Sequence, residues 1–297
     1  MKRLLFVYNP TSGKGAITGN VTTIVDAFTK AGWLVTIYPT QGTGDATRVT
    51  RELAPQFDRV VCCGGDGTLS ETVSGLLTLD QPPVLGYIPA GTTNDFSKNL
   101  SLPRGVEKAA ATAAAGVPRP CDMGRFNDRT FVYVAAFGIF TDVSYGTPQP
   151  FKSAFGHLAY VLEGATKLGD LGRSYHLKVE HDGGSLEGDF LYGMVTNTSS
   201  VGGFKIFPPH QVSLDDGVFE VVLIRQPRSL ADFQETLLAL ARQSAGGSGR
   251  VEAFHTSRLT VSTPEPLPWT LDGEYGGDPE TARIENLHHA ITLVWGK

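Results

Sequence analysis

The chain has little cysteine, no large excess of charge of either sign and no long apolar run. Its 297 residues contain 3 cysteines, and 25 Lys and Arg against 30 Asp and Glu give a net charge of −5. A general nucleic-acid binder needs clustered positive charge to neutralise phosphates, so this balance argues against that class. No segment reaches the roughly 18 consecutive apolar residues of a membrane span. The composition, 41% hydrophobic and 19% charged, is typical of a globular protein and excludes disorder and coiled coil.

Neither the N-terminus nor the cysteines indicate export. The apolar segment at residues 4–8 is too short for the core of a signal peptide, and no small-residue cleavage site follows it. Cys62 and Cys63 are adjacent in an apolar run, and neighbours on a strand point to opposite faces. Neither a disulfide between them nor a zinc site is therefore expected. We expect these cysteines and Cys121 to be reduced, and the protein to be cytoplasmic.

Short apolar runs alternate with helical patterns in the first part of the chain. The runs lie at residues 4–8, 34–38, 59–63 and 84–88, and helical patterns lie at 21–30, 47–53 and in SETVSGLL. This alternation predicts βαβ units and a mainly parallel sheet. Ligands bind such sheets at the carboxyl ends of the strands. We therefore expect the glycine-rich loops that follow the runs to converge on one crevice.

The pattern changes after about residue 122. Segments such as TFVYVAAFG, GDFLYGMVTN and GVFEVVLIR read as strands separated by Gly, Asp and Pro turns, as in a sandwich. Helical patterns lie among them at 157–168 and 230–244. We predict an α/β domain with a mainly parallel sheet over 1–122 and a mostly antiparallel β-sandwich domain over 123–297. The last strand, HHAITLVWG, could return to the first domain.

GGDGT at residues 64–68 is the sharpest signal for chemistry. Two glycines after a strand let backbone N–H groups approach phosphate oxygens. The Asp66 carboxylate would be misplaced beside bare phosphates unless a divalent cation stood between them, and Mg²⁺ prefers oxygen ligands. The alternative is a sharp strand-to-helix turn with an aspartate cap. That alternative explains neither the double glycine nor the match to the neighbouring loops.

Two more strand ends carry polar loops. NPTSGKG at 9–15 places hydroxyls and a lysine among glycines, but lacks the spacing of a Walker A loop. It fits either a phosphate cradle or a surface turn before a helix. PAGTTNDF at 89–96 adds Thr92, Asn94 and Asp95. Asn94 or Asp95 could also serve simply as a helix N-cap.

Two acidic turns follow in the second domain. LDGEYGG at 271–277 contains Glu274, and LDDG at 214–217 contains Asp216. On residue type alone, each fits a solvated turn between strands. The seven histidines show no metal-binding spacing, so packing at the surface or in the core is expected for all of them, including the adjacent His288 and His289.

The motifs NPTSGKG, GGDGTLSETVSGL, PAGTTNDF and LDGEYGG, in this order, resemble those of the soluble bacterial diacylglycerol kinases. SYGTPQPFKSAFGHLAYVLEG at 144–164 and VSLDDGVFEVV at 212–222 match as well, so the resemblance covers nearly the whole chain. It implies a nucleotide domain, then a β-sandwich domain, with the active site in the cleft between them. It also implies a kinase that uses ATP and Mg²⁺ to phosphorylate diacylglycerol to phosphatidic acid.

The resemblance assigns roles to residues of the first domain. Asp66 and Asp95 would organise the catalytic Mg²⁺ through its waters, and Asp122 with Lys14 and Lys98 would form a supporting charged network. The neutral AITGN after NPTSGKG lacks a basic residue that the family often carries there, which leaves the size of this network open. The ATP site would be lined by Asn9, Thr11, Ser12, Gly13, Thr40, Gly65, Asp66, Gly67, Thr68, Glu71 and Thr92.

In the second domain, the resemblance makes Glu274 the general base that takes the proton of the lipid hydroxyl. This role fits chemically, because an alcohol is a weak nucleophile and phosphoryl transfer depends on positioning and charge neutralisation. A second, structural Mg²⁺ would be held by Asp216 with the backbone carbonyls of Ser213 and Val218. Hard cations accept such carbonyl oxygens readily.

Diacylglycerol stays in the bilayer, so the resemblance implies transient peripheral docking at the inner face of the cytoplasmic membrane. Phe151, Lys152 and Phe155 are the candidate contacts, and a homodimer is plausible by family analogy. Another acceptor, such as phosphatidylglycerol, a sphingoid base or a ceramide-like lipid, would fit the same catalytic frame. NAD kinases share GGDGT but are disfavoured by PAGTTNDF and LDGEYGG. A non-catalytic lipid- or nucleotide-binding protein is disfavoured because the acid set is complete.

Overall fold

The computed structural model describes residues 1–15, 17–92, 94–138, 174–198, 207, 212–229, 231–232, 235–236 and 249–296, without the side chain of Lys14. These residues belong to two compact units. The first comprises Met1–Met123 and His288–Lys297, and the second comprises Gly124–Leu287. The helix expected over 157–168 lies outside the described residues. Of the helix expected over 230–244, only 231–232 and 235–236 are described, and they are helical.

The first unit is built on a parallel sheet. Its strands β1 (Lys2–Tyr8), β2 (Trp33–Pro39), β3 (Arg59–Gly64) and β4 (Val84–Pro89) pair in the order β2-β1-β3-β4, and the end of β15 (Thr281–Trp295) runs parallel beside β4. Every residue of β3 is buried. Strands covered on both faces read as continuous apolar runs, which is why the sequence predicts them well.

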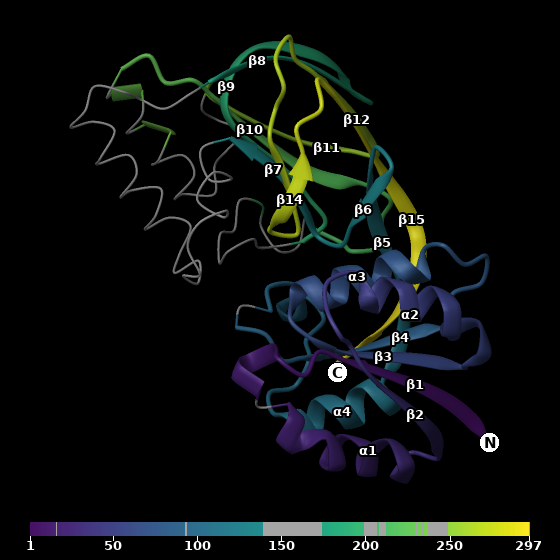
Figure 1. Ribbon diagram of the computed structural model, residues 1–297. Coiled ribbons are helices and arrows are strands. Elements are labelled where there is room, and N and C mark those ends of the chain that lie inside the picture. Colours follow the sequence, from purple (N-terminus) through teal and green to yellow (C-terminus); the bar gives the residue numbers. More distant parts are fainter. Residues whose placement is uncertain are drawn as a thin grey trace. The chain divides into compact units, whose positions relative to one another are not determined.

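Helices cover both faces of this sheet (Figure 1). α1 (Val21–Lys30) and α4 (Val106–Ala115) lie on one face, and α2 (Asp45–Leu53) and α3 (Asp66–Leu76) lie on the other. Short 3-10 turns occur at η1 (Ser12–Gly15), η2 (Thr18–Asn20), η3 (Ala54–Gln56) and η4 (Phe96–Lys98). Cys63 belongs to the core on the α1 and α4 face, whereas the Cys62 thiol contacts Thr72 of α3. The adjacent thiols therefore point to opposite faces, and both are free.

The second unit consists mainly of antiparallel strands. They are β6 (Arg129–Phe131), β7 (Val134–Gly138), β8 (Tyr175–His181), β9 (Gly184–Thr196), β10 (Phe219–Arg225), β11 (Val251–Thr256), β12 (Arg258–Ser262), β13 (Trp269–Leu271) and β14 (Glu274–Gly277), with the end of β5 (Val117–Phe126) and the start of β15. The order is β14-β13-β7-β9-β8-β12-β15, and β10 lies between β9 and β11.

The core of the second unit is aromatic. The Trp269 ring lies 4.9 Å from that of Phe137 and 5.1 Å from that of Phe126, measured between centroids. Alternate residues of β7 and β10 face this core, as do alternate residues of β8, β12 and β15, and β9 contributes Phe190 and Val195. The predicted fold class, a parallel α/β part followed by a β-sandwich-like part, is confirmed. No helix of the described residues is long and apolar enough to cross a membrane.

A buried arginine completes the last turn of α4. The Arg59 side chain on β3 donates hydrogen bonds from Nη1 to the carbonyl oxygens of Ala113, at 3.0 Å, and Ala114. Its guanidinium also lies 5.1 Å from the centroid of the Trp33 ring, whose Nε1 donates to the Ala114 carbonyl oxygen at 3.0 Å. These donors satisfy carbonyls that a helix C-terminus otherwise leaves unpaired.

We predict that Arg59→Met lowers the free energy of unfolding by about 1.5–3 kcal/mol, because the charged hydrogen bonds are lost while the apolar stem is kept. Urea denaturation of the Met variant measures this loss. Arg51→Met, at an exposed position of α2, is the matched control and should change stability little. Equal losses in both variants would contradict the prediction.

Candidate active site

The loop after β1 is closed by the side chain of Asn9. Asn9 Oδ1 accepts hydrogen bonds from the Thr11 N–H at 2.9 Å and from Thr11 Oγ1 at 2.8 Å, which forms a local turn. Asn9 Nδ2 also lies 3.4 Å from Oγ1 of Thr68, in the first turn of α3. Asn9 therefore joins the loop after β1 to the loop after β3.

Glycines let the loops after β1, β3 and β4 approach backbone to backbone. A Cβ atom on Gly91 would lie 2.5 Å from the Gly65 Cα, and one on Gly13 would lie 2.5 Å from the Ala90 carbonyl oxygen. Both distances are shorter than any real contact of a Cβ atom, so side chains are excluded there. The structure thus brings three of the glycine-rich loops singled out in the sequence to one edge of the sheet.

Asp66 and Asp95 lie together at this edge. The Asp66 carboxylate accepts hydrogen bonds from the N–H groups of Asp95 at 3.0 Å and Phe96 at 3.4 Å. Burial raises the pKa of Asp66, and the charge of Asp95 raises it further, while these N–H groups and Lys98 act in the opposite direction. Asp95 is 5% exposed, and its Oδ1 lies 2.6 Å from Lys98 Nζ. Two close carboxylates of low exposure favour a bound cation, and oxygen ligands suit Mg²⁺.

Neither Asn94 nor Asp95 makes a side-chain N-cap hydrogen bond to η4. Asn94 Oδ1 instead accepts from the Gly91 N–H at 2.8 Å, and its Nδ2 donates to the Gly91 carbonyl oxygen at 2.6 Å. Asn94 has a φ of 47°, a left-handed conformation that asparagine tolerates better than most residues. Asn94 therefore closes the turn that holds Asp95 beside Asp66.

Glu71, expected at the ATP site, points its carboxylate at the start of α2. Its two oxygens accept from the N–H groups of Gly44 at 2.7 Å and Ala46 at 3.2 Å. The Thr40 N–H donates to the Tyr8 carbonyl oxygen at 2.9 Å and continues the pairing of β1 with β2. Glu71 thus positions the loop after β2. Thr92, another expected ATP contact, is exposed.

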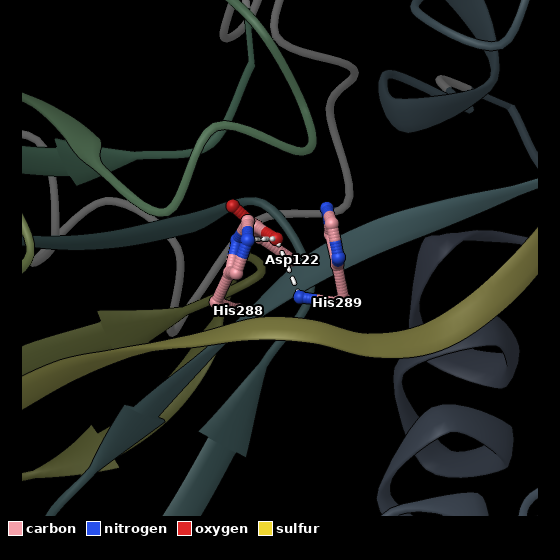
Figure 2. Close-up of side chains that lie close together, drawn as sticks. All are labelled: Asp122, His288 and His289. Carbon is pink, nitrogen blue, oxygen red and sulfur yellow. Dashed lines mark hydrogen bonds and ion pairs between the residues drawn. The ribbon is translucent and has the colours of Figure 1, made fainter.

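Asp122 is fully buried on β5 and contacts two histidines of β15 (Figure 2). Its Oδ1 accepts from the His289 N–H at 2.7 Å and lies 3.0 Å from His288 Nδ1. Lys98, expected in the same network as Asp122, donates a hydrogen bond from Nζ to Asp95 Oδ1. The sequence assigned both histidines to packing and contained no signal that joins them to Asp122, because the contact spans 166 residues.

Glu274 begins the second strand of a tight hairpin in the second unit. Asp272 and Gly273, with φ of 52° and 89°, form the two-residue turn between β13 and β14. The Asp272 carboxylate is buried and accepts from three consecutive N–H groups, those of Val132 at 2.8 Å, Tyr133 at 3.0 Å and Val134 at 3.2 Å. Asp272 anchors the turn, and the neighbouring Glu274 side chain is exposed.

The LDDG turn precedes β10 in the same unit. Asp216 Oδ1 accepts from the Val218 N–H at 3.2 Å, and Gly217 has the left-handed φ of 80° that the turn requires. Ser213 Oγ donates to Asp215 Oδ1 at 2.6 Å. Ser213, Asp216 and Val218, expected to hold a structural cation, thus lie in one short turn. Phe151, Lys152 and Phe155, expected to contact the membrane, lie outside the described residues.

We predict that Asp272→Asn lowers the free energy of unfolding by about 1–3 kcal/mol. The asparagine NH₂ group would replace one carboxylate oxygen, and a donor would then face the backbone N–H groups that this oxygen accepts. Chemical denaturation measures the change. Asp278→Asn is the control, since this exposed carboxylate accepts a single hydrogen bond from the Tyr275 hydroxyl in the described structure. An Asp272 variant as stable as the control would show that the turn does not depend on its anchor.

Comparison with known proteins places both parts of the chain. Residues 3–126 match the diacylglycerol kinase catalytic domain, and residues 143–294 match the YegS C-terminal NAD kinase beta sandwich-like domain. The chain is 38% identical to a diacylglycerol kinase of Bacillus subtilis, over 100% of this chain and 97% of that protein. It is 34% identical to one from Staphylococcus carnosus, over 100% and 96% of the two chains.

Solved structures agree with these matches. A crystal structure of a candidate diacylglycerol kinase from Bacillus anthracis superposes with a TM-score of 0.82 at 26% identity, over 99% of this chain and 95% of that one. The catalytic-domain match and identities of 38% and 34% over the whole chain show more than a shared fold. The chain therefore belongs to the diacylglycerol kinase family.

Proposed function

We propose that this protein transfers the γ-phosphoryl group of ATP to the free hydroxyl of diacylglycerol and releases phosphatidic acid and ADP. The observation that carries the proposal is the pair Asp66 and Asp95, in which the N–H groups of Asp95 and Phe96 donate to the Asp66 carboxylate within the matched catalytic domain. The identity of 38% and 34%, over the whole chain, to proteins named diacylglycerol kinase supports the same reaction.

The ATP phosphates would bind at the loops after β1 and β3. Gly65 precedes α3, whose N-terminal N–H groups and positive dipole end favour an anion. The absence of side chains at Gly13 and Gly65 leaves the backbone accessible to phosphate oxygens. The hydroxyls of Thr11 and Ser12, after β1, and of Thr68, in the first turn of α3, would add donors. Thr40 and Glu71 would support this site through the loop after β2.

The carboxylates of Asp66 and Asp95 would hold Mg²⁺ through its waters. Their fit to a hard cation is supported by the raised pKa of Asp66, which reflects burial beside a second acid. A bound Mg²⁺ would neutralise charge on the transferred phosphoryl group. Lys98 holds Asp95 in place through its ion pair, and Asp122 and Lys14 would complete the charged network.

Glu274 would accept the proton of the lipid hydroxyl. A carboxylate in this role must be positioned before the substrate arrives, and the Asp272 anchor fixes the backbone from which Glu274 extends. Because diacylglycerol remains in the bilayer, the protein would dock at the inner membrane surface. Phe151, Lys152 and Phe155 remain our candidates for the membrane contact. We also expect a homodimer, by analogy with the family. Because the product is phosphatidic acid, the reaction would serve phospholipid synthesis.

We predict that Glu274→Gln lowers ATP-dependent phosphorylation of diacylglycerol in mixed micelles by about 10²–10⁴-fold, since the general base is lost. The single variant Asp66→Asn should lose most of the wild-type transfer activity as well. Glu280→Gln, an exposed glutamate of the same unit, is the matched control and should retain activity. Phosphatidylglycerol, sphingosine, ceramide and NAD are tested in parallel. Transfer to another lipid would replace the acceptor, and transfer to NAD alone would overturn the proposal.

We further propose a structural cation at the LDDG turn, held by Asp216 and the carbonyls of Ser213 and Val218. The fit is supported by Glu220, which is fully buried on β10 and whose two carboxylate oxygens make no hydrogen bond of normal geometry to the described residues. His255 Nε2 lies 3.9 Å from Oε1, beyond hydrogen-bond range. Burial, together with the charge of Asp216 and against the opposing effect of the N–H groups of Glu220 and Thr198, raises the pKa of Glu220 to about 8. A cation would relieve this repulsion.

We predict that Mg²⁺ raises the unfolding temperature of the wild type relative to chelator, by the linkage of binding to folding. In Asp216→Asn, Mg²⁺ should raise the unfolding temperature by less than in the wild type, because the variant keeps only the proposed catalytic Mg²⁺ site. Asp80→Asn, an exposed control, should keep all of it. Differential scanning calorimetry measures the three proteins. An Asp216 variant with the full Mg²⁺ increment would contradict the structural cation.

A further inference from the structure

His288 and His289 are adjacent on β15, yet their side chains lie on the same side of the strand. Neighbouring residues of a strand normally point to opposite faces. His289 breaks this alternation with a φ of 53°, in the left-handed region. Its imidazole consequently stacks on that of His288, with 3.7 Å between ring centroids and 28° between planes. Backbone conformations of this kind are costly and are concentrated at functional sites.

The Asp122 carboxylate completes the group from another strand (Figure 2). It is fully buried, accepts from the His289 N–H at 2.7 Å, and lies 3.0 Å from Nδ1 of His288. One ligand atom from each of Asp122, His288 and His289 lies within 4.8 Å of the others. All three residues belong to the first compact unit. The contact between Asp122 Oδ1 and His288 Nδ1 also fixes the orientation of the His288 ring beside the carboxylate.

We propose that Asp122, His288 and His289 form a binding site for a transition-metal dication of the Zn²⁺ class. Two imidazoles and a carboxylate are the ligand set that Zn²⁺ and its neighbours take, whereas Mg²⁺ prefers oxygen alone. The site therefore differs in chemistry from the acid pair Asp66 and Asp95. Three protein ligands leave a fourth position of a tetrahedral ion for water or an external ligand.

The stacked rings can reach a common ion by small rotations. A metal ion lies in the plane of each imidazole that binds it, so the nearly parallel rings must turn. Rotation about the last side-chain bond of histidine has broad, shallow preferences, and the His288 side chain is 50% exposed. The backbone of β15 can stay in place, because the His289 conformation already sets both rings on one side.

Spectroscopic titration with Co²⁺, followed by displacement with Zn²⁺, tests the proposal on the full-length protein without measuring kinase activity. The decisive variant is His289→Gly, because glycine accepts the left-handed backbone and keeps the N–H bond to Asp122 while the imidazole is removed. His288→Gln is the second ligand variant. His181→Gln, which removes a histidine stacked on Phe254 in the second unit, is the matched control.

In excess Mg²⁺, which fills the proposed oxygen sites, we expect one tightly bound ion per wild-type chain, with the d–d absorption of four-coordinate Co²⁺. Both ligand variants should bind about 100-fold more weakly or worse, and the control should bind like the wild type. Circular dichroism confirms that the variants are folded. A wild type that binds no more Co²⁺ or Zn²⁺ than His289→Gly would overturn the site, as would equal loss of binding in His181→Gln.

Discussion

The close approach of three loop backbones is the constraint on which the candidate active site depends. The loops after β1, β3 and β4 meet where Gly13 and Gly91 leave no room for a Cβ atom, and the backbone of Gly91 lies against that of Gly65. At this separation the N–H groups of Asp95 and Phe96 donate to the Asp66 carboxylate. The parallel order of β1, β3 and β4 places these strand ends side by side, so the sheet determines which loops can meet.

The molecule places ionisable carboxyl groups where burial disfavours their charged form. Asp66 lies beside Asp95, and Glu220 is fully buried near the charge of Asp216; burial raises the pKa of both Asp66 and Glu220. Such arrangements cost folding free energy unless a counter-charge is present. Both are rich in oxygen, as hard cations require, whereas Asp122 with His288 and His289 offers nitrogen as well. The proposed oxygen sites and the proposed nitrogen-containing site would therefore take different classes of metal ion.

Much of the fold could be predicted because buried strands and amphipathic helices leave direct patterns in the sequence. Helix 21–30 matches α1, and the four apolar runs lie within β1 to β4. The start of α2 was predicted two residues late, at 47 and not at Asp45, because its first turn is held by the Glu71 carboxylate from α3. The final strand was also predicted too short, since β15 begins at Thr281, where buried and exposed residues alternate.

The sequence by itself determined the family and the order of the strands along the chain, and it predicted which loops would carry the chemistry. Glycine-rich motifs with acids after apolar runs indicate ligand binding at strand ends, and their order identifies the family. Tertiary structure alone decided which groups meet: Asp66 with the N–H of Asp95, Glu71 with Gly44, and Asp122 with His288 and His289. The reason is physical, because a hydrogen bond depends on distance and direction in space, and no local pattern records contacts between residues so far apart in the chain.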